Sequence, residues 1–187
     1  MAPPPKGPPQ TKLGQPGWRR QAFDRLVKAI QDHTGKSAKA FSPMTTLQEL
    51  EELFALSSVA LGVLDDSGEV QGFLMGVDPG ENYDSENYRY FESRITNHFY
   101  IDRVVLSESL RGQGAGTALY EHVFDLARQA GRDGVTCEVN LQPPNPGSLR
   151  FHHRMGFVDV DTQATKGGAV VVQLLQAPLG GSPHAKI

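Results

Sequence analysis

The chain has 187 residues, of which 39% are hydrophobic, and a formal net charge of -3. This length and composition suffice for one sizeable core, so we expect a single domain. The small negative charge offers no broad basic surface for nucleic acid, and no apolar run reaches the roughly 18 residues that span a bilayer. We therefore expect a soluble, cytoplasmic protein that binds neither nucleic acid nor a membrane.

The two ends of the chain and its cysteine content set further expectations. The single cysteine, Cys137, excludes an internal disulfide and a multi-cysteine metal site, and we expect no metal ion. The opening MAPPPKGPPQ lacks the apolar core of a secretion signal. Because 1–17 is rich in proline and glycine and poor in large apolar side chains, we predict a disordered tail there. One domain over 18–177 and a flexible tail over 178–187 follow.

Apolar spacing predicts the secondary structure along the chain. The predicted helices share apolar residues every three or four positions, and they cover 18–30, 45–58, 117–131 and 148–155. The predicted strands share β-branched and aromatic runs, and they are two strands joined by a tight turn within 58–78, then 98–106, 135–141, 157–163 and 169–175. Hairpins around one strand-helix-strand crossover imply an α/β fold in which a mixed sheet has helices on both faces.

A glycine-rich corner joins the strand at 98–106 to the helix at 117–131. Gly112, Gly114 and Gly116 let the backbone approach a ligand, and the unpaired N–H groups of the first helical turn attract an anion. The corner therefore predicts a phosphate-binding loop, although such a corner can also be only a tight turn. A Walker loop would have a lysine here, and the dinucleotide fingerprint would have glycine or alanine where Thr117 stands, so neither ATP nor NAD is indicated.

Two sequence segments resemble one known family. The run RGQGAG at 111–116 resembles the R/Q-x-x-G-x-G/A signature of the GNAT superfamily of N-acetyltransferases. Downstream, NPGSLRFHHRMGF is similar to the family's second cofactor segment, matching it at Asn145, Ser148, Phe151, Gly156 and Phe157. The resemblance covers roughly Ser57 to Leu175 and extends to a subgroup of predicted acetyltransferases whose acceptors are not known.

The resemblance implies a mostly antiparallel sheet of about six to seven strands and a site for acetyl-CoA. The strand end formed by Val104, Val105 and Leu106 would diverge from the strand at 135–141, with the pantetheine arm in the gap and a backbone N–H polarising the thioester carbonyl. Arg111 would hold the pyrophosphate together with the backbone of the corner. The other implied cofactor contacts are Gly112, Gln113, Gly114, Ala115, Gly116, Asn140, Asn145, Ser148 and Phe151. The asparagines are equally suited to capping loops.

The implied reaction is direct attack of a neutral amine on the acetyl thioester in a ternary complex, which needs a base and an acid. His152 stands where the family usually has a tyrosine, and it is the predicted acid; a solvent-facing histidine is the alternative. Asp102 is the first candidate for the base, with Tyr100 on the same strand face and Glu138 on the neighbouring strand as further candidates. A salt bridge is the alternative role for Asp102. Cys137 is expected in the core.

The acceptor is expected to contact the long connection DPGENYDSENYRYFESR, because long loops in compact domains are often functional. Tyr83, Tyr88 and Tyr90 lie there among acidic residues, and such groups suit a cationic amine through charge and cation–π attraction. A solvated loop with its rings against the sheet is the alternative. We expect a primary amine of a small molecule or peptide as acceptor. A non-catalytic acyl-CoA sensor, a protein-interaction module and a homodimer remain open.

Overall fold

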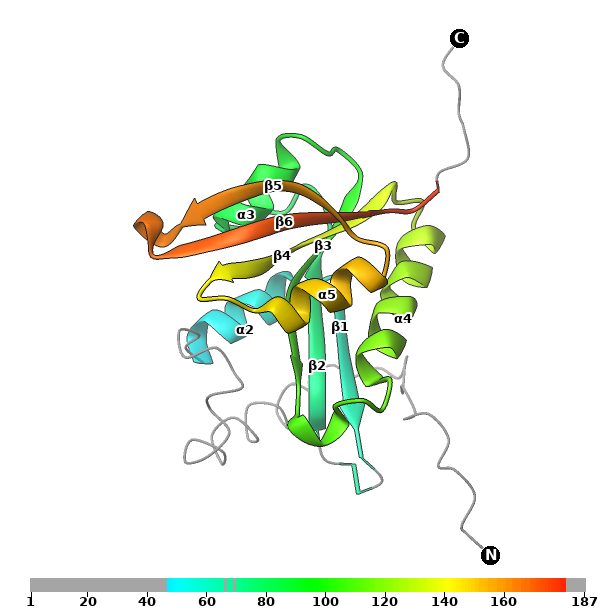
Figure 1. The fold of residues 1–187 in the computed structure, drawn as a ribbon. Coiled ribbons are helices and arrows are strands. Elements are labelled where there is room, and N and C mark those ends of the chain that lie inside the picture. Colours follow the sequence, from blue (N-terminus) through cyan, green and yellow to red (C-terminus); the bar gives the residue numbers. More distant parts are fainter. Residues whose placement is uncertain (1–46, 66, 69, 181–187) are drawn as a thin grey trace, which may run out of the picture. The chain divides into compact units, whose positions relative to one another are not determined.

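The structure is a computed structural model that describes residues 47–65, 67–68 and 70–180. The predicted helix at 18–30 and the predicted tail at 1–17 lie outside these residues. The described chain forms two compact units, whose helices and strands are labelled in Figure 1. Among the described residues, unit 1 comprises those from 47 to 75 and Arg103–Leu119, and unit 2 comprises Gly76–Asp102 and those from 120 to 180.

The described elements follow the predicted order, with helix α3 and two short 3-10 helices in addition. In chain order they are α2 Leu47–Leu56, β1 Val59–Leu64, β2 Val70–Val77, α3 Glu86–Glu92, β3 His98–Leu106, η1 Glu108–Leu110, α4 Ala115–Gln129, β4 Gly134–Gln142, α5 Pro146–Arg154, β5 Val158–Thr165, η2 Lys166–Gly168 and β6 Val170–Pro178. Within the described residues the strands form one six-stranded sheet with the order β1-β2-β3-β4-β6-β5. The predicted mixed, mostly antiparallel α/β fold is therefore confirmed.

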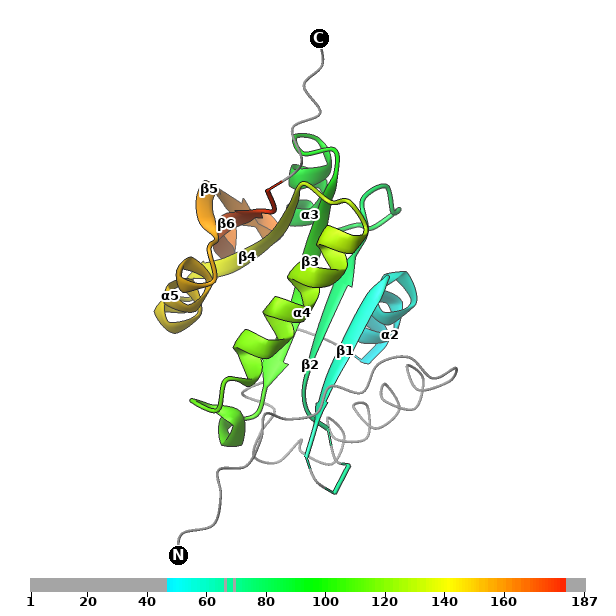
Figure 2. The ribbon, with the colours of Figure 1, turned by 90° about the vertical axis from the view of Figure 1, so that its right-hand side faces the viewer.

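Unit 1 positions the glycine-rich corner at the end of β3. Leu50 and Leu53 of α2 are buried, and Figure 2 shows α2 beside β1. The backbones of β2 and β3 approach closely, since a Cβ at Gly72 would lie 2.8 Å from the carbonyl oxygen of Val105. After β3, the N–H of Ser107 donates to the carbonyl of Gln71 at 2.8 Å. This hydrogen bond fixes the position of the backbone just before the corner.

Unit 2 contains the parallel pairing of β3 with β4. The paired positions are His98 with Gly134, Phe99 with Val135 and Tyr100 with Thr136. Strand β4 also pairs antiparallel with β6, with a register shift between Asn140 and Gln142, and β6 pairs antiparallel with β5. The thiol of Cys137 is buried within β4, so its predicted place in the core is confirmed.

The sequence analysis predicted a loop between β2 and β3, but the structure contains helix α3 there. Ser85 caps the helix, and its Oγ accepts a hydrogen bond from the N–H of Tyr88 at 3.3 Å. Tyr88 and Phe91, three residues apart on one helical face, are buried. A helix of seven residues is too short to be stable in isolation, so the packing of this pair stabilises it.

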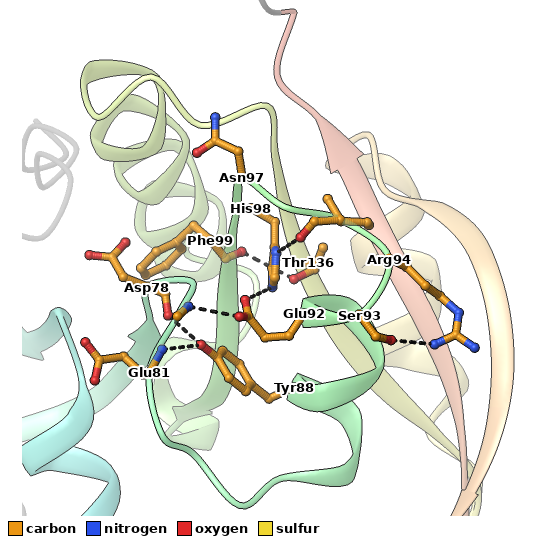
Figure 3. A network of polar contacts seen from close by, with 12 residues as sticks. Asp78, Glu81, Tyr88, Glu92, Ser93, Arg94, Asn97, His98, Phe99 and Thr136 are labelled. Carbon is orange, nitrogen blue, oxygen red and sulfur yellow. Dashed lines mark hydrogen bonds and ion pairs between the residues drawn. The ribbon is translucent and has the colours of Figure 1, made fainter.

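Polar contacts fix this connection within unit 2 (Figure 3). The hydroxyl of Tyr88 donates to the carbonyl of Asp78 at 2.8 Å and accepts from the N–H of Glu81 at 2.9 Å. The N–H of Gly80 donates to Oε2 of Glu92 at 2.9 Å. These bonds anchor both the start of the connection and its helix, so the segment is an ordered part of the unit.

The C-terminal part of the domain extends beyond the predicted boundary at 177. Strand β6 runs to Pro178, and Leu179 is buried with its N–H donating to the carbonyl of Asp133 at 2.9 Å. Residues 181–187 lie outside the described chain. Among the residues that the structure describes, no helix is both long enough and apolar enough to cross a membrane.

Candidate active site

The glycine-rich corner of unit 1 lies between β3 and α4, as the sequence analysis expected. Gly112 and Gly114 have φ values of +72° and +79°, in the left-handed region that favours glycine. A Cβ at either position would meet nothing within 4 Å, so the space beside this backbone is open. The side chain of Gln113 folds back, with Nε2 donating to the carbonyl of Ser109 at 2.6 Å, and this bond fixes the corner.

The start of α4 completes a site for an anion. The helix begins at Ala115, and the N–H of Ala118 donates to the carbonyl of Gly114 at 3.0 Å. The N–H groups of residues 115–117 precede that bond, so they are the donors that a helix leaves for other partners. Arg111 is exposed and lies 3.4 Å from Glu108 in a surface ion pair, which such exposure makes weak. These residues fit the pyrophosphate that the sequence analysis assigned to them.

The second predicted cofactor segment forms the start of α5 in unit 2. Asn145 is the N-cap, and its Oδ1 accepts from the N–H of Ser148 at 3.2 Å. Capping, the alternative given for this asparagine, is therefore what its side-chain oxygen does. Asn140 is exposed at the irregular end of β4, and its carbonyl accepts from the N–H of Asn145 at 3.0 Å. Phe151 is half-buried, with its ring edge-on to Tyr120 at 5.2 Å.

His152 is buried, at 6% relative exposure, so the alternative of a solvent-facing histidine does not hold. Its Nδ1 lies 2.8 Å from the carbonyl oxygen of Ser148, and its Nε2 lies 2.7 Å from the hydroxyl of Tyr120. A carbonyl only accepts, so Nδ1 carries the proton and, in the neutral ring, Nε2 accepts from the tyrosine. Burial lowers the pKa of His152. Its acid role stays a prediction, and it requires a second proton on the ring.

Two carboxylates with tyrosine partners lie in unit 2, where β3 and β4 leave their paired positions. The hydroxyl of Tyr100 donates to Oε2 of Glu138 at 2.8 Å, and the hydroxyl of Tyr83 donates to Oδ1 of Asp102 at 2.6 Å. Asp102 and Glu138 each stand two residues past the last pair between β3 and β4, which is Tyr100 with Thr136. The structure therefore brings together all three predicted base candidates and one predicted acceptor residue.

Both carboxylates, Glu138 and Asp102, influence the pKa of Tyr100. Burial raises the pKa of Tyr100 well above its ordinary value, and the negative charges of Glu138 and Asp102 raise it further. Tyr100 therefore keeps its proton and acts as a hydrogen-bond donor, which leaves the carboxylates as the groups able to accept a proton.

The three predicted acceptor tyrosines have different surroundings. Tyr88 is 1% exposed and belongs to the core, as the alternative reading with rings against the sheet expected. Tyr90 is half-buried, donates to Oδ2 of Asp161 at 2.9 Å and has the guanidinium of Arg94 over its ring at 3.9 Å. Tyr83 is half-buried and reaches Asp102. The tyrosines at 83 and 90 thus each donate a hydrogen bond to a carboxylate.

Sequence reasoning gave no role to Tyr120, which the structure places against the predicted acid. Tyr120 is 32 positions before His152 in the chain and reaches it from α4. Its apolar helical neighbours predict burial, but no local pattern predicts which residue its hydroxyl would contact. The pairing of Tyr83 with Asp102, 19 positions apart, lacked a local signal for the same reason.

Comparison with known proteins decides the family. The model of the acetyltransferase (GNAT) family matches residues 27–157. The chain belongs to this family. Its members transfer the acetyl group of acetyl-CoA to amines, so the predicted N-acetyltransferase class is confirmed.

Solved structures share the fold at low sequence identity. These structures include Ard1 from Thermoplasma volcanium, with a TM-score of 0.64, 16% identity and coverage of 91% of this chain and 97% of that one. A chain of the NatC complex bound to Gag peptide and CoA has a TM-score of 0.64 and 15% identity, over 92% and 99% of the two chains. Nourseothricin acetyltransferase has a TM-score of 0.51 and 19% identity, over 64% of each chain. A search of curated protein sequences found no match.

Proposed function

We propose that this GNAT protein transfers an acetyl group to a primary amine of a small molecule or peptide by direct attack within a ternary complex. Acetyl-CoA, when bound, supplies the acetyl group as a thioester that a neutral amine nitrogen can attack. The observation that carries the proposal is the pair of tyrosine-bonded carboxylates, Asp102 and Glu138, at the end of the paired part of β3 and β4. A base at this place is what an acceptor arriving as an ammonium ion requires.

The glycine-rich corner is the proposed grip on the cofactor. The N–H groups of the corner and of the first turn of α4 would donate to the pyrophosphate, and Arg111 would add charge-assisted hydrogen bonds. The open space beside Gly112 and Gly114 supports this role, because a side chain there would occupy the ligand's place. Val104, Val105 and Leu106 are the proposed backbone partners of the pantetheine arm, as in the family.

Asp102 is the proposed base. Its carboxylate would take the proton from the incoming ammonium, so that the nitrogen lone pair becomes available for attack. Glu138 is the second candidate, and Tyr100 is better suited to donate a hydrogen bond than to accept a proton. The negative charge of the two carboxylates also favours a cationic acceptor over a neutral one.

The acceptor's identity is a matter for experiment. The NatC neighbour is bound to a peptide, and the nourseothricin enzyme is named for a small-molecule antibiotic, so both classes belong in the test. The measurement is release of free CoA thiol from acetyl-CoA with a panel of small amines, amino acids, polyamines and peptides with free N-termini. We expect turnover with at least one cationic amine. Thiol release with none of them, by a protein that binds acetyl-CoA, would contradict the proposal.

Two variants separate the candidate bases. Asp102→Asn should lower kcat by roughly a hundred- to ten-thousand-fold, the range for loss of a general base, while acetyl-CoA binding stays within a few-fold. Glu138→Gln is the matched control on the neighbouring strand, because it removes one charge and keeps an acceptor for the hydroxyl of Tyr100. The larger loss of kcat in Glu138→Gln would move the base to that residue.

A further inference from the structure

We infer that Tyr83 is a positioning residue for Asp102, and that the connection between β2 and β3 serves the base rather than only the acceptor. The inference rests on the proposed function, in which Asp102 takes the proton from the amine. It assigns to one hydroxyl the orientation of that carboxylate during turnover.

The contact itself is short and directional. The hydroxyl of Tyr83 donates to Oδ1 of Asp102 at 2.6 Å, the distance of a charge-assisted O–H to carboxylate bond. Such a bond fixes the position of one carboxylate oxygen. A base must present a lone pair within hydrogen-bond reach of the proton it takes, and fixing Oδ1 restricts where Oδ2 can point.

The part of the connection that carries Tyr83 is itself held in place. The ring of Tyr83 packs against the ring of Tyr88, with centroids 5.6 Å apart. Tyr88 is buried, and its hydroxyl bonds to the backbone of Asp78 and Glu81 on either side of the turn that leads to Tyr83. The N–H of Tyr83 adds a bond to the carbonyl of Glu81 at 2.9 Å. The hydroxyl is therefore presented by an ordered segment, as positioning requires.

The second function of the bond is electrostatic. Ionisable groups around Asp102 in unit 2 include Tyr83, Tyr100 and Glu138. The negative charge of Glu138 disfavours a second negative charge nearby, whereas a hydroxyl that donates to Asp102 favours the ionised carboxylate. Donation from Tyr83 therefore favours the ionised form of Asp102, which is the form that can accept a proton.

The test removes only the hydroxyl. In Tyr83→Phe the ring that packs on Tyr88 remains, so the connection keeps its apolar contact. We expect kcat to fall by roughly ten-fold and the acidic limb of the kcat/KM profile to move up by about one pH unit, the size expected when one charge-assisted hydrogen bond to a carboxylate is lost. The KM for acetyl-CoA should not change.

A matched control removes a different tie of the same connection. Asn87 accepts a hydrogen bond from Nε2 of Gln163 through its Oδ1 at 3.0 Å, which links α3 to β5 without touching Asp102. Asn87→Ala should leave kcat and the acidic limb as in the parent. If it reproduced the effect of Tyr83→Phe, general loosening of the connection would explain both results and the inference would be overturned.

Other outcomes of these experiments also test the positioning role of Tyr83. A higher KM for the amine in Tyr83→Phe, with kcat and the acidic limb unchanged, would make Tyr83 an acceptor contact and overturn its positioning role. A shift of the limb in Tyr100→Phe but not in Tyr83→Phe would assign the base to Glu138. An active parent with an unaltered Tyr83→Phe variant removes this inference alone, whereas a parent that acetylates no amine removes the proposed function with it.

Discussion

The hydroxyl of Tyr120 donates a hydrogen bond to Nε2 of His152 at 2.7 Å, inside the aromatic core of unit 2. The sequence resemblance places His152 where the family usually has a tyrosine, and in the structure both of its ring nitrogens are bonded, because Nδ1 donates to the carbonyl of Ser148. A substitution at His152 or Tyr120 therefore affects folding stability as well as any catalytic role of His152. Each change leaves a buried polar group of the other residue without its hydrogen-bond partner.

The first prediction uses that dependence. His152→Phe should destabilise the protein by about 1–3 kcal/mol, the cost of leaving the buried hydroxyl of Tyr120 unsatisfied. The double variant Tyr120→Phe/His152→Phe should be less destabilised than the sum of the two single variants, because both polar partners are gone. Thermal unfolding of the three variants measures this, with exposed His153→Ala as the control. Strict additivity would show that the hydrogen bond carries no coupling energy.

The second prediction concerns pH and stability. Burial lowers the pKa of both His98 and His152 below their ordinary value. A folded state with lowered histidine pKa values binds fewer protons than the unfolded chain between the folded pKa and about 6.5. The stability from these neutral rings is therefore fully present above about pH 6.5 and is lost as pH falls toward the folded pKa values.

We therefore expect the Tm to fall between pH 7 and pH 5. Nearby charges do not reverse this expectation. Oε1 of Glu92 lies 3.8 Å from Nε2 of His98, so its charge favours the protonated ring and narrows the pH range over which stability is lost. The double variant His98→Gln/His152→Gln should show a smaller fall in Tm over this range. An equally steep fall in the variant would assign the pH dependence to other groups.

The third prediction tests the cofactor grip. Saturating acetyl-CoA should raise the Tm of the parent, since ligand at about 100 times its Kd contributes roughly 2.7 kcal/mol. Arg111→Ala and Gly114→Val should each reduce this ligand-induced shift, the first by removing charge-assisted bonds and the second by placing a side chain in the open space beside the backbone.

The design needs a control because Gly114 has a φ of +79°, so valine strains the corner even without ligand. The shift on adding acetyl-CoA, rather than the Tm itself, is the quantity to compare. Glu108→Gln removes the ion-pair partner of Arg111 but keeps the guanidinium, and it should bind acetyl-CoA at least as well as the parent. Parent-like shifts in both test variants would exclude the corner from cofactor binding.

Features with a local sequence signal were predicted well. The strand from His98 to Leu106 has the predicted bounds because its β-branched and aromatic run is continuous. The glycine-rich corner carried a local signal, because its glycines stand between a strand and a helix, and the structure adds positive φ values at Gly112 and Gly114. Helix α3 did carry a signal, with Ser85 as a cap ahead of an apolar pair, but so short a helix depends on burial that the sequence alone does not reveal.

Side-chain contacts between distant elements were beyond the sequence. Strand alternation put Asp102 and Tyr100 on one face. It could not show that Tyr83, 19 positions before Asp102, would donate a hydrogen bond to it. Likewise, the motif placed His152 at the family's tyrosine position, but its burial and its tautomer follow from packing against Tyr120. The sequence therefore indicated which residues matter, and the structure supplied the partners that set their chemistry.

The last prediction concerns His152 as the acid. In the neutral ring, Nδ1–H is committed to a carbonyl and Nε2 has no proton, so donation to the departing thiolate requires the imidazolium form. Because burial lowers the pKa of His152, the imidazolium form becomes abundant only at a pH below the ordinary pKa of histidine. An acid role therefore predicts that kcat of the parent contains a component that grows as pH falls, and that His152→Phe removes it.

The comparison is best made in the background that avoids an unsatisfied phenol. We expect Tyr120→Phe/His152→Phe to have a kcat roughly ten- to a thousand-fold below that of Tyr120→Phe at the low end of the pH profile, with the two converging above neutral pH and acetyl-CoA affinity within a few-fold. Single-turnover rates would ensure that chemistry is measured. Equal rates at every pH would remove His152 from the proton transfer, because a thiol as acidic as that of CoA can depart without a protein acid, and would leave the imidazole as a buried acceptor for Tyr120.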